Sequence, residues 1–258
     1  MVLLNLGCGS RVHPDWVNID YFPTAMFRRF FSRSSLPVNF VNHDLRKGIP
    51  IGDSSADAVY SSHLLEHLPP ESVPLFLREH RRVLKTGGVA RIVVPDLELA
   101  ARQYLKALEN CRVVGEAGQL EHEWATILLL DQLVRIRSGG QMQAWLMKHR
   151  ETKLVRSMQG IFIEIAQASI PKPAGFSLAS IKSWLRRNNQ LVSAGELHRW
   201  MYDELALKRL LKTCGFDLVK IVDPDTSRIQ GWSNYYLDRS PGGTIHQPGS
   251  IYIEGIKD

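Results

Sequence analysis

The chain has 258 residues, 44% of them hydrophobic, which fits one large domain or one domain with a sizeable insertion. No apolar stretch approaches the roughly 18–20 residues of a membrane span. The first apolar run, about five residues long, is too short for a signal peptide. The three cysteines are far apart and not in zinc spacing, so we expect a reduced, cytoplasmic protein.

The formal net charge of +6 is concentrated in one stretch of the sequence. Residues 97–200 contain fourteen Lys/Arg and nine Asp/Glu, a balance of +5. A basic surface favours an anionic substrate, nucleic acid or acidic lipid, and an ordinary soluble surface explains the same charge equally well.

Short β-prone runs alternate with helical patterns along the first hundred residues. Several of these runs are apolar on both faces, as parallel strands covered by helices are. The predicted strands are 2–6, 17–19, 38–41, 58–61 and 89–94. A helical pattern follows the fourth strand, with Ser72 as its expected N-cap and Gly87-Gly88 as its expected end. Asp96 is the expected cap of the next helix.

The alternation disappears between residues 110 and 195, where two long segments have a helical pattern. It resumes with a helix that ends at Gly215 and with strands in 217–224 and 250–258. This pattern predicts one α/β domain over residues 1–258, a wound sheet with a helical insertion at 110–195. We expect the insertion to form a lid or acceptor pocket, with a homodimer interface as the alternative.

The glycine turn Gly7-Cys8-Gly9 follows the first predicted strand, and we compared it with three kinds of ligand site. A P-loop needs Lys-Ser/Thr after its glycines, which this chain lacks. A dinucleotide fold needs a third glycine, where this chain has Val12, and an acidic residue further on than Asp20. S-adenosylmethionine needs close backbone approach at the turn and a carboxylate for its ribose hydroxyls, which Asp20 supplies.

The ordered motifs LNLGCGS, VNIDYF, VNHDL, DAVYSSHLLEHL and LREHRRVLKTGGVARIVVPD resemble those of class I S-adenosylmethionine-dependent methyltransferases. The resemblance is closest to a bacterial branch associated with polysaccharide or other small-molecule methylation. It covers residues 1–96 and about 196–258, and it implies a Rossmann-like doubly wound sheet of seven strands, mostly parallel with the last strand antiparallel. The first crossover is shorter than usual, which leaves little room for a helix.

The resemblance also implies which residues bind the donor. The turn would lie against the methionine part, and Asp20 with its neighbour would hold the ribose. Asp44 and its neighbour would meet the adenine, although a helix cap is an alternative role for Asp44. The residues implied for S-adenosylmethionine are Gly7, Cys8, Gly9, Asp20, Tyr21, Asp44, Leu45, Ser61, Ser62 and His63.

The sequence HLLEH at residues 63–67 matches the inverted zinc-protease pattern H-x-x-E-H. The motif follows a predicted strand directly and stops at Pro69-Pro70, which leaves barely one helical turn, so we predict no metal site. Some class I enzymes that methylate the terminal ribose of small RNAs carry E-x-x-E-H here and hold a divalent ion. A metal-dependent RNA ribose methyltransferase is therefore one alternative, although the chain has no RNA-binding motif.

The leading hypothesis is methyl transfer to a hydroxyl of a small molecule, a sugar or glycan precursor. A hydroxyl acceptor benefits from a base within hydrogen-bond reach, and the candidates are His67, His198 and Tyr202. The acceptor is a small molecule, with an anionic one suited to the basic stretch. Nucleic acid is not favoured, and the aromatic and arginine residues of 22–35 suit a flap or a peripheral membrane contact. The alternative from another class is a non-catalytic module that binds S-adenosylmethionine.

Overall fold

The computed structural model describes residues 1–22, 39–136, 139–158, 160, 162 and 197–258. The chain divides into two compact units, which are described separately. The first unit contains residues Met1–Pro95, Tyr202–Gly243 and Ser250–Asp258. The second contains Asp96–Met201 and Thr244–Gly249.

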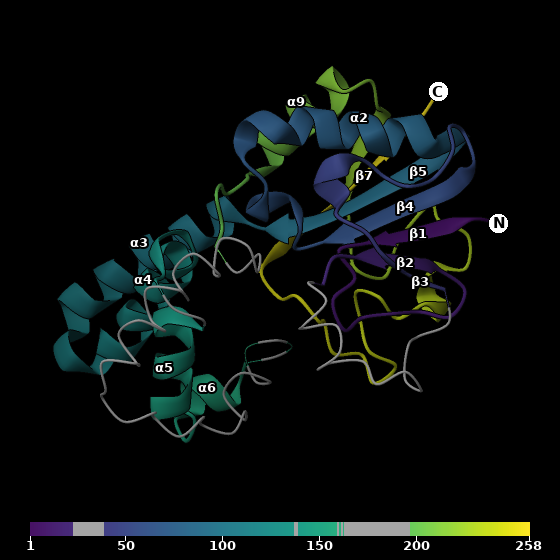
Figure 1. Ribbon diagram of the computed structural model, residues 1–258. Coiled ribbons are helices and arrows are strands. Elements are labelled where there is room, and N and C mark those ends of the chain that lie inside the picture. Colours follow the sequence, from purple (N-terminus) through teal and green to yellow (C-terminus); the bar gives the residue numbers. More distant parts are fainter. Residues whose placement is uncertain (23–38, 137–138, 159, 161, 163–196) are drawn as a thin grey trace, which may run out of the picture. The chain divides into compact units, whose positions relative to one another are not determined.

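One sheet organises the first unit, and its order over the described residues is β3-β2-β1-β4-β5-β7-β6 (Figure 1). The strands are β1 (Leu3–Leu6), β2 (Val17–Asp20), β3 (Phe40–Asn42), β4 (Ala56–Ser62), β5 (Leu84–Pro95), β6 (Asp217–Val222) and β7 (Ser250–Ile256). The first five strands are parallel, and β7 is antiparallel to both β5 and β6. This confirms the predicted seven-stranded Rossmann-like sheet with an antiparallel last strand.

Two amphipathic helices, α2 (Val73–Val83) and α9 (Glu204–Thr213), cover one face of the sheet (Figure 1). Each helix packs one apolar face against the strands, where Leu77, Leu207 and Leu211 are fully buried. The Asp203 carboxylate caps α9 by accepting from the Ala206 amide at 2.7 Å. The hydrophobic core of this unit therefore lies between the sheet and these two helices.

The end of α2 differs from the prediction, which placed it at Gly87-Gly88. The helix ends at Val83, and both glycines lie within β5. The reason is the full burial of Leu84, which takes an extended conformation and pairs with Ala56 in the sheet. The glycines instead allow the irregular pairing of β4 and β5, with Gly87 at a φ of +79°.

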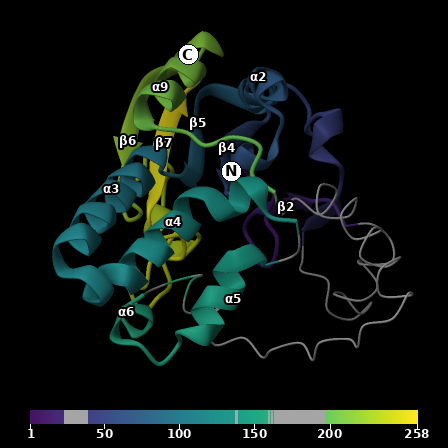
Figure 2. The same cartoon turned by 90° about the vertical axis from the view of Figure 1, so that its left-hand side faces the viewer.

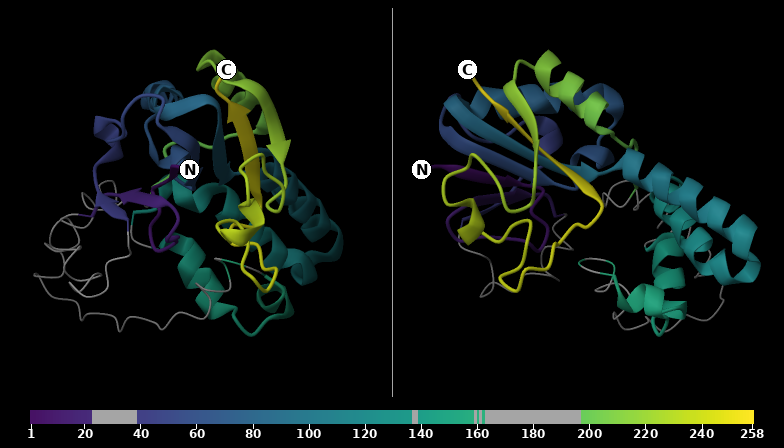
Figure 3. Two further views of the ribbon diagram at one scale, coloured as in Figure 1. Left: turned by 90° about the vertical axis from the view of Figure 1, so that its right-hand side faces the viewer. Right: turned by 180° about the vertical axis from the view of Figure 1, so that it is seen from behind.

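The opposite face of the sheet is covered by the connection between β6 and β7, of which residues 223–243 belong to this unit (Figure 3). Residues 7–16, which link β1 to β2, form no helix, as the short crossover predicted. The buried ring of Trp16 at the end of this link packs edge-on against Trp232 of the connection, with centroids 6.3 Å apart. Irregular backbone thus takes the place of a crossover helix on this face.

Four helices make up most of the described part of the second unit: α3 (Leu97–Val114), α4 (Gln119–Val134), α5 (Gly140–Lys148) and α6 (Lys153–Arg156). Asp96 caps α3, as predicted, by accepting from the Leu99 amide at 3.1 Å. The helices α3 and α4 lie side by side (Figure 2). A small core contains Trp145 and Leu146, with Trp124 and Leu128 packed against it, whereas Leu130 is 47% exposed.

Several sequence-based expectations fall outside the described residues. They are the flap at 22–35, except for its first residue, and residues 163–195 of the expected helical insertion. Among the described residues, the model contains no helix long and apolar enough to cross a membrane.

Candidate functional site

The carboxyl ends of the parallel strands bring most of the predicted donor-site residues of the first unit to one edge of the sheet. The register pairs Leu6 with Ile19 and with Ser61, so the residues that follow β1, β2 and β4 are neighbours. The strand order changes direction at β1 and β4, since the chain runs from β1 outward to β3 and then returns on the other side. Open α/β sheets bind their ligands outside this switch point.

The glycine turn is held directly against the end of β2. The Gly7 amide donates to the Ile19 carbonyl at 2.8 Å, and the Gly9 amide donates to Asp20 Oδ2 at 2.7 Å. Both glycines have positive φ, +65° and +51°. A Cβ on Gly7 would meet Leu64 at 2.9 Å, whereas none of the described residues lies within 4 Å of a Cβ position on Gly9. The turn therefore needs glycine, and it leaves space beside Gly9.

Cys8, between the two glycines, points its thiol into the protein. Burial, with the charge of Asp20 as a second cause, raises the pKa of this thiol to about 12. A thiol with that pKa is neutral at physiological pH and is therefore neither a metal ligand nor a nucleophile. Cys8 contributes its backbone to the turn, while its side chain packs.

The Asp44 carboxylate follows β3 and already has partners within the chain. It caps a short 3₁₀ turn (Leu45–Lys47) and accepts from Arg46 Nε and Nη2, both at 2.8 Å. These hydrogen bonds to Arg46 lower the pKa of Asp44, so the carboxylate is ionised. The cap that was the alternative role for this residue is present, and Leu45 packs against the core. Tyr21, beside the ribose candidate Asp20, is 47% exposed.

Ser61, Ser62 and His63 end β4 at the switch point. Ser61 is 1% exposed, and its hydroxyl has no hydrogen-bond partner among the described residues. His63 has a φ of +51°, which is uncommon for a residue with a side chain. Its Nε2 lies 2.9 Å from Ser250 Oγ, and its Nδ1 lies 3.3 Å from Glu66 Oε1. Ser250 is a neighbour that sequence reasoning missed.

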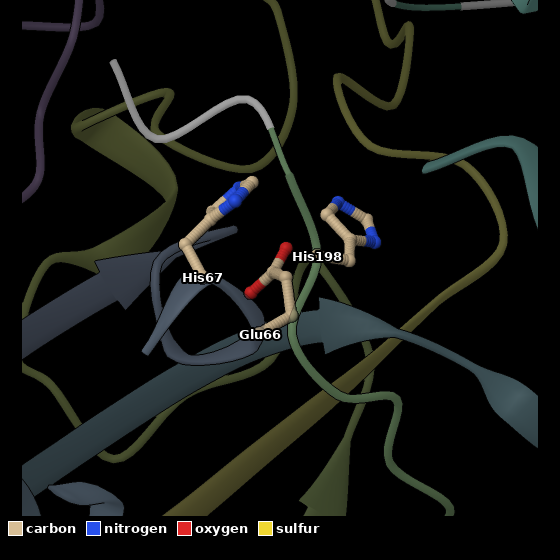
Figure 4. Close-up of side chains that lie close together, drawn as sticks. All are labelled: Glu66, His67 and His198. Atoms are coloured by element: carbon tan, nitrogen blue, oxygen red, sulfur yellow. The ribbon is translucent and has the colours of Figure 1, made fainter. Parts of the chain in front are cut away.

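The HLLEH segment forms a 3₁₀ turn (Leu65–His67) rather than a long helix, as its position before Pro69-Pro70 predicted. Figure 4 shows Glu66 and His67 on this turn. The Glu66 side chain is fully buried, and burial raises its pKa to about 8. His67 is partly buried, and its amide donates to the Leu64 carbonyl at 3.2 Å. Glu66 is thus a carboxyl group that is largely protonated at neutral pH.

The two other catalytic candidates belong to different units. Tyr202 starts the return of the chain into the first unit and is 5% exposed, and its hydroxyl has no hydrogen-bond partner among the described residues. Burial, with the charge of Glu66 as a second cause, raises the pKa of Tyr202 to about 12. His198, also drawn in Figure 4, belongs to the second unit, where its ring lies 2.9 Å from Gln132 Nε2.

The comparisons with known proteins were made by family, by sequence and by structure. Residues 4–92 match the model of the methyltransferase domain family. No curated protein sequence matches the chain.

Solved structures similar to this chain include a S-adenosylmethionine-dependent methyltransferase from Methanosarcina mazei, with 16% identity and a TM-score of 0.45 over 99% of this chain and 92% of that one. Another comes from Archaeoglobus fulgidus, with 16% identity and a TM-score of 0.41 over 99% and 86% of the two chains. Scores at this level identify neither substrate nor mechanism.

The matched segment contains the glycine turn, Asp20, Asp44 and the end of β4, which are residues predicted from the sequence for the donor site. The open space beside Gly9 fits a ligand that approaches the backbone closely, because any side chain there would fill it. Residues 4–92 are therefore similar to a methyltransferase domain.

Proposed function

We propose that this protein transfers a methyl group from S-adenosylmethionine to a hydroxyl of a small molecule, a sugar or glycan precursor. The observation that supports it most directly is the glycine turn bound to Asp20 through the 2.7 Å hydrogen bond from the Gly9 amide. The choice of a sugar follows from the resemblance to the bacterial branch associated with polysaccharide methylation. The three free cysteines agree with a cytoplasmic location.

In this proposal the donor lies along the carboxyl edge of the sheet. Its methionine part would lie on Gly7, Cys8 and Gly9, and its ribose hydroxyls would bind Asp20 beside Tyr21. Both Asp20 oxygens already accept backbone hydrogen bonds, from Gly9 at 2.7 Å and from Tyr21 at 2.6 Å, and each keeps a lone pair for a hydroxyl.

The adenine would lie beyond β3, and the methyl group near the end of β4. Asp44 would share its carboxylate between Arg46 and the adenine amino group, with Leu45 below. Ser61, Ser62 and His63 would border the methyl end of the donor. The buried Ser61 hydroxyl has no hydrogen-bond partner among the described residues, and the bound donor would supply one.

S-adenosylmethionine supplies a methyl group already activated by its sulfonium, so the protein contributes alignment, exclusion of water and a proton acceptor. Alignment and exclusion of water together contribute up to about 7–11 kcal/mol in such reactions. Tyr202 would act as a neutral hydrogen-bond donor, because its pKa of about 12 keeps the phenol protonated. His67 and His198 remain the proposed imidazole bases. His67 follows β4, and His198 comes from the second unit.

Residues 110–195 would form the lid or acceptor pocket, and the positive balance of residues 97–200 suits an anionic acceptor. A homodimer interface is the alternative role of residues 110–195. Light scattering, which measures the size of the particle, and limited proteolysis together distinguish the two roles. A dimer that forms without ligand would favour the interface, whereas a monomer whose 110–195 segment gains protease resistance with donor and acceptor would favour the lid.

Calorimetric titration with S-adenosylmethionine tests the donor site. We expect wild type to bind with a Kd of about micromolar order, and Asp20→Asn to bind about tenfold or more weakly, since a hydrogen bond to a charged group contributes about 1.5–3 kcal/mol. The matched control is Asp217→Asn, on the exposed first residue of β6. Absence of binding by wild type, or equal binding by Asp20→Asn and Asp217→Asn, would overturn the proposal.

An assay of S-adenosylhomocysteine formation tests the acceptor class. The acceptors are free monosaccharides, nucleotide sugars and a short RNA with a terminal 2′-hydroxyl, each with and without EDTA. Turnover with a sugar that EDTA does not change supports the proposal. Turnover with RNA alone, lost in EDTA, would show the metal-dependent alternative, and donor binding without turnover would favour a binding module.

A further inference from the structure

Three polar side chains lie in a row at the carboxyl edge of the sheet, two of them just after β4 and the third at the start of β7. Ser250 Oγ lies 2.9 Å from His63 Nε2, and His63 Nδ1 lies 3.3 Å from Glu66 Oε1. Ser250 reaches this edge because β7 is antiparallel, so that its first residue pairs with Pro95 at the end of β5. All three residues belong to the first unit.

The row runs from a partly exposed end to a fully buried one. The His63 side chain is 23% exposed and that of Glu66 is 0% exposed. A serine, an imidazole and a carboxyl group in this order also occur in catalytic triads, where the carboxylate orients the ring and stays ionised. Here burial raises the pKa of Glu66 to about 8 and lowers that of His63 to about 3, so the carboxylate is the stronger base of the two. His63 Nδ1 and Glu66 Oε1 are within reach of each other but are not aligned as a hydrogen bond. Catalytic hydrogen bonds are often poorly aligned before substrate is in place and tighten when it binds.

We propose that Ser250, His63 and Glu66 form a relay that takes the proton from the hydroxyl of the methyl acceptor, in place of the imidazole candidates His67 and His198. The relay rests on the proposed function, because only a hydroxyl acceptor has such a proton to lose. Ser250 would be the catalytic group that touches the acceptor. His63 and Glu66 would act behind it as positioning and proton-holding groups.

The step balances in atoms and charge. The acceptor oxygen forms its bond to the methyl carbon as the carbon–sulfur bond of the donor breaks. The acceptor proton passes to Ser250 Oγ, the serine proton to His63 Nε2, and the proton on Nδ1 to the Glu66 carboxylate. The positive charge of the sulfonium and the negative charge of the carboxylate disappear together, which leaves a neutral thioether and a neutral carboxylic acid.

The direction of the hydrogen bonds depends on the ionisation of Glu66. When Glu66 is protonated it donates to Nδ1, so the ring holds its proton on Nε2 and donates to Ser250. When Glu66 is ionised the proton lies on Nδ1, and Nε2 accepts from Ser250, which is the direction that the relay needs. The Glu66 pKa of about 8, raised by burial, places this change near neutral pH.

Burial and the neighbouring charges keep the His63 imidazole neutral, and Tyr202 beside Glu66 stays neutral as well. Burial first, and then the charges of His67 and Arg11, lower the pKa of His63 to about 3. Tyr202 faces Glu66 and stays protonated, because its pKa is about 12. Glu66 is thus the group of the row that changes its charge between pH 6 and 9 or so.

Histidine ¹⁵N NMR of the full-length protein with bound S-adenosylhomocysteine reads this change without any turnover. His63→Gln assigns the signals. We expect His63 to convert from the Nε2–H to the Nδ1–H tautomer between about pH 6.5 and 9.5, with a midpoint near 8, and Glu66→Gln to abolish the transition. A single His63 tautomer throughout in wild type, or an unchanged transition in Glu66→Gln, would overturn the relay.

Methyl transfer to the sugar acceptor that gives turnover tests the catalytic role. We expect kcat to rise with pH through about 8 in wild type, to fall about 10²-fold or more in Ser250→Ala with donor affinity unchanged, and to lose this pH dependence in Glu66→Gln. The matched control is Ser72→Ala, because the Ser72 side chain makes no cap hydrogen bond.

The two failures are distinguishable. If wild type transfers methyl groups and Ser250→Ala is as active as Ser72→Ala, the relay is wrong and the proposed function stands. If wild type transfers no methyl group to any hydroxyl acceptor, the proposed function fails, and the catalytic role of the relay fails with it.

Discussion

Arg91 offers the sharpest test of how the sheet is held together, because it is a fully buried cation in the middle of β5. Its guanidinium forms ion pairs at 2.8 Å with Asp238 and with Glu254, both buried. It also donates to the Thr226 carbonyl at 2.8 Å, and its charge lies 4.3 Å from the centre of the Trp232 ring. Arg91 thus fastens the connection between β6 and β7 to the sheet.

We predict that Arg91→Met lowers the free energy of unfolding by about 3–5 kcal/mol, because it leaves two buried carboxylates without their counter-charge. Both carboxylates keep hydrogen bonds, from Tyr60 to Asp238 at 2.6 Å and from the Arg228 amide to Glu254 at 3.0 Å. These bonds hold the carboxylates in place and do not replace the lost charge, which is why the predicted loss exceeds that of one neutral hydrogen bond.

The loss should shrink at low pH. Burial raises the pKa of Asp238 in the folded protein, and the Arg91 charge opposes that rise. Without Arg91 the folded pKa rises further above its unfolded value, so the folded variant binds more protons than the unfolded chain. Its stability is then lost as pH rises through the folded pKa, and recovers as pH falls below it.

Urea unfolding followed by circular dichroism measures both effects. The matched control is Lys85→Met, which removes a cation that pairs with Asp57 at 2.8 Å where both side chains are 31% exposed or more. That control should lose less than about 1 kcal/mol. A loss below about 1 kcal/mol for Arg91→Met, or one that does not change with pH, would refute the reasoning.

Gly9→Ala should cost about 1 kcal/mol of unfolding free energy, because a residue with a Cβ disfavours the φ of +51°, and calorimetry should show weaker donor binding. Donor binding no weaker than in the control Gly52→Ala, an exposed glycine with open space around it, would contradict this. Asp203→Ala should lower the unfolding free energy by about 1 kcal/mol in urea, since the Ala206 amide loses its cap, and Asp203→Asn should retain most of it. Tyr202→Phe should leave the melting temperature unchanged or higher, because its buried hydroxyl has no hydrogen bond among the described residues. A clear fall in the melting temperature of Tyr202→Phe would show that the Tyr202 hydroxyl has a hydrogen-bond partner.

The sheet, and the meeting of its strand ends at one edge, could be predicted from the sequence because they depend on local pattern. The run Leu3–Leu6 is buried at every position, as a central parallel strand must be. Parallel strands bring their carboxyl ends together, so the residues after β1, β2 and β4 were expected to meet before any coordinates were known. The Gly9 and Asp20 contact follows from this rule and from the short link between the two strands.

The rest depends on pairing between distant residues, which pattern does not encode. His63 meets Ser250 across 187 residues, and Arg91 meets Asp238 across 147. One signal was present in the sequence: an arginine inside the apolar run of residues 89–94 needs buried acidic partners. Which acids these were depended on the register of β7 against β5.

The link between β1 and β2 explains why the candidate donor site does not consist of residues 4–92 alone. A crossover helix would normally cover the face beneath the glycine turn, and this chain has no helix in residues 7–16. Trp16 of that link instead packs on Trp232, which comes from the connection that Arg91 holds to the sheet. The glycine turn therefore lies in the matched segment. The residues that support it, and Ser250 at the same edge of the sheet, come from the last 40 residues or so. Weakening the Arg91 network should for that reason loosen the turn as well as the fold, so donor affinity should fall in Arg91→Met even at temperatures where the protein remains folded.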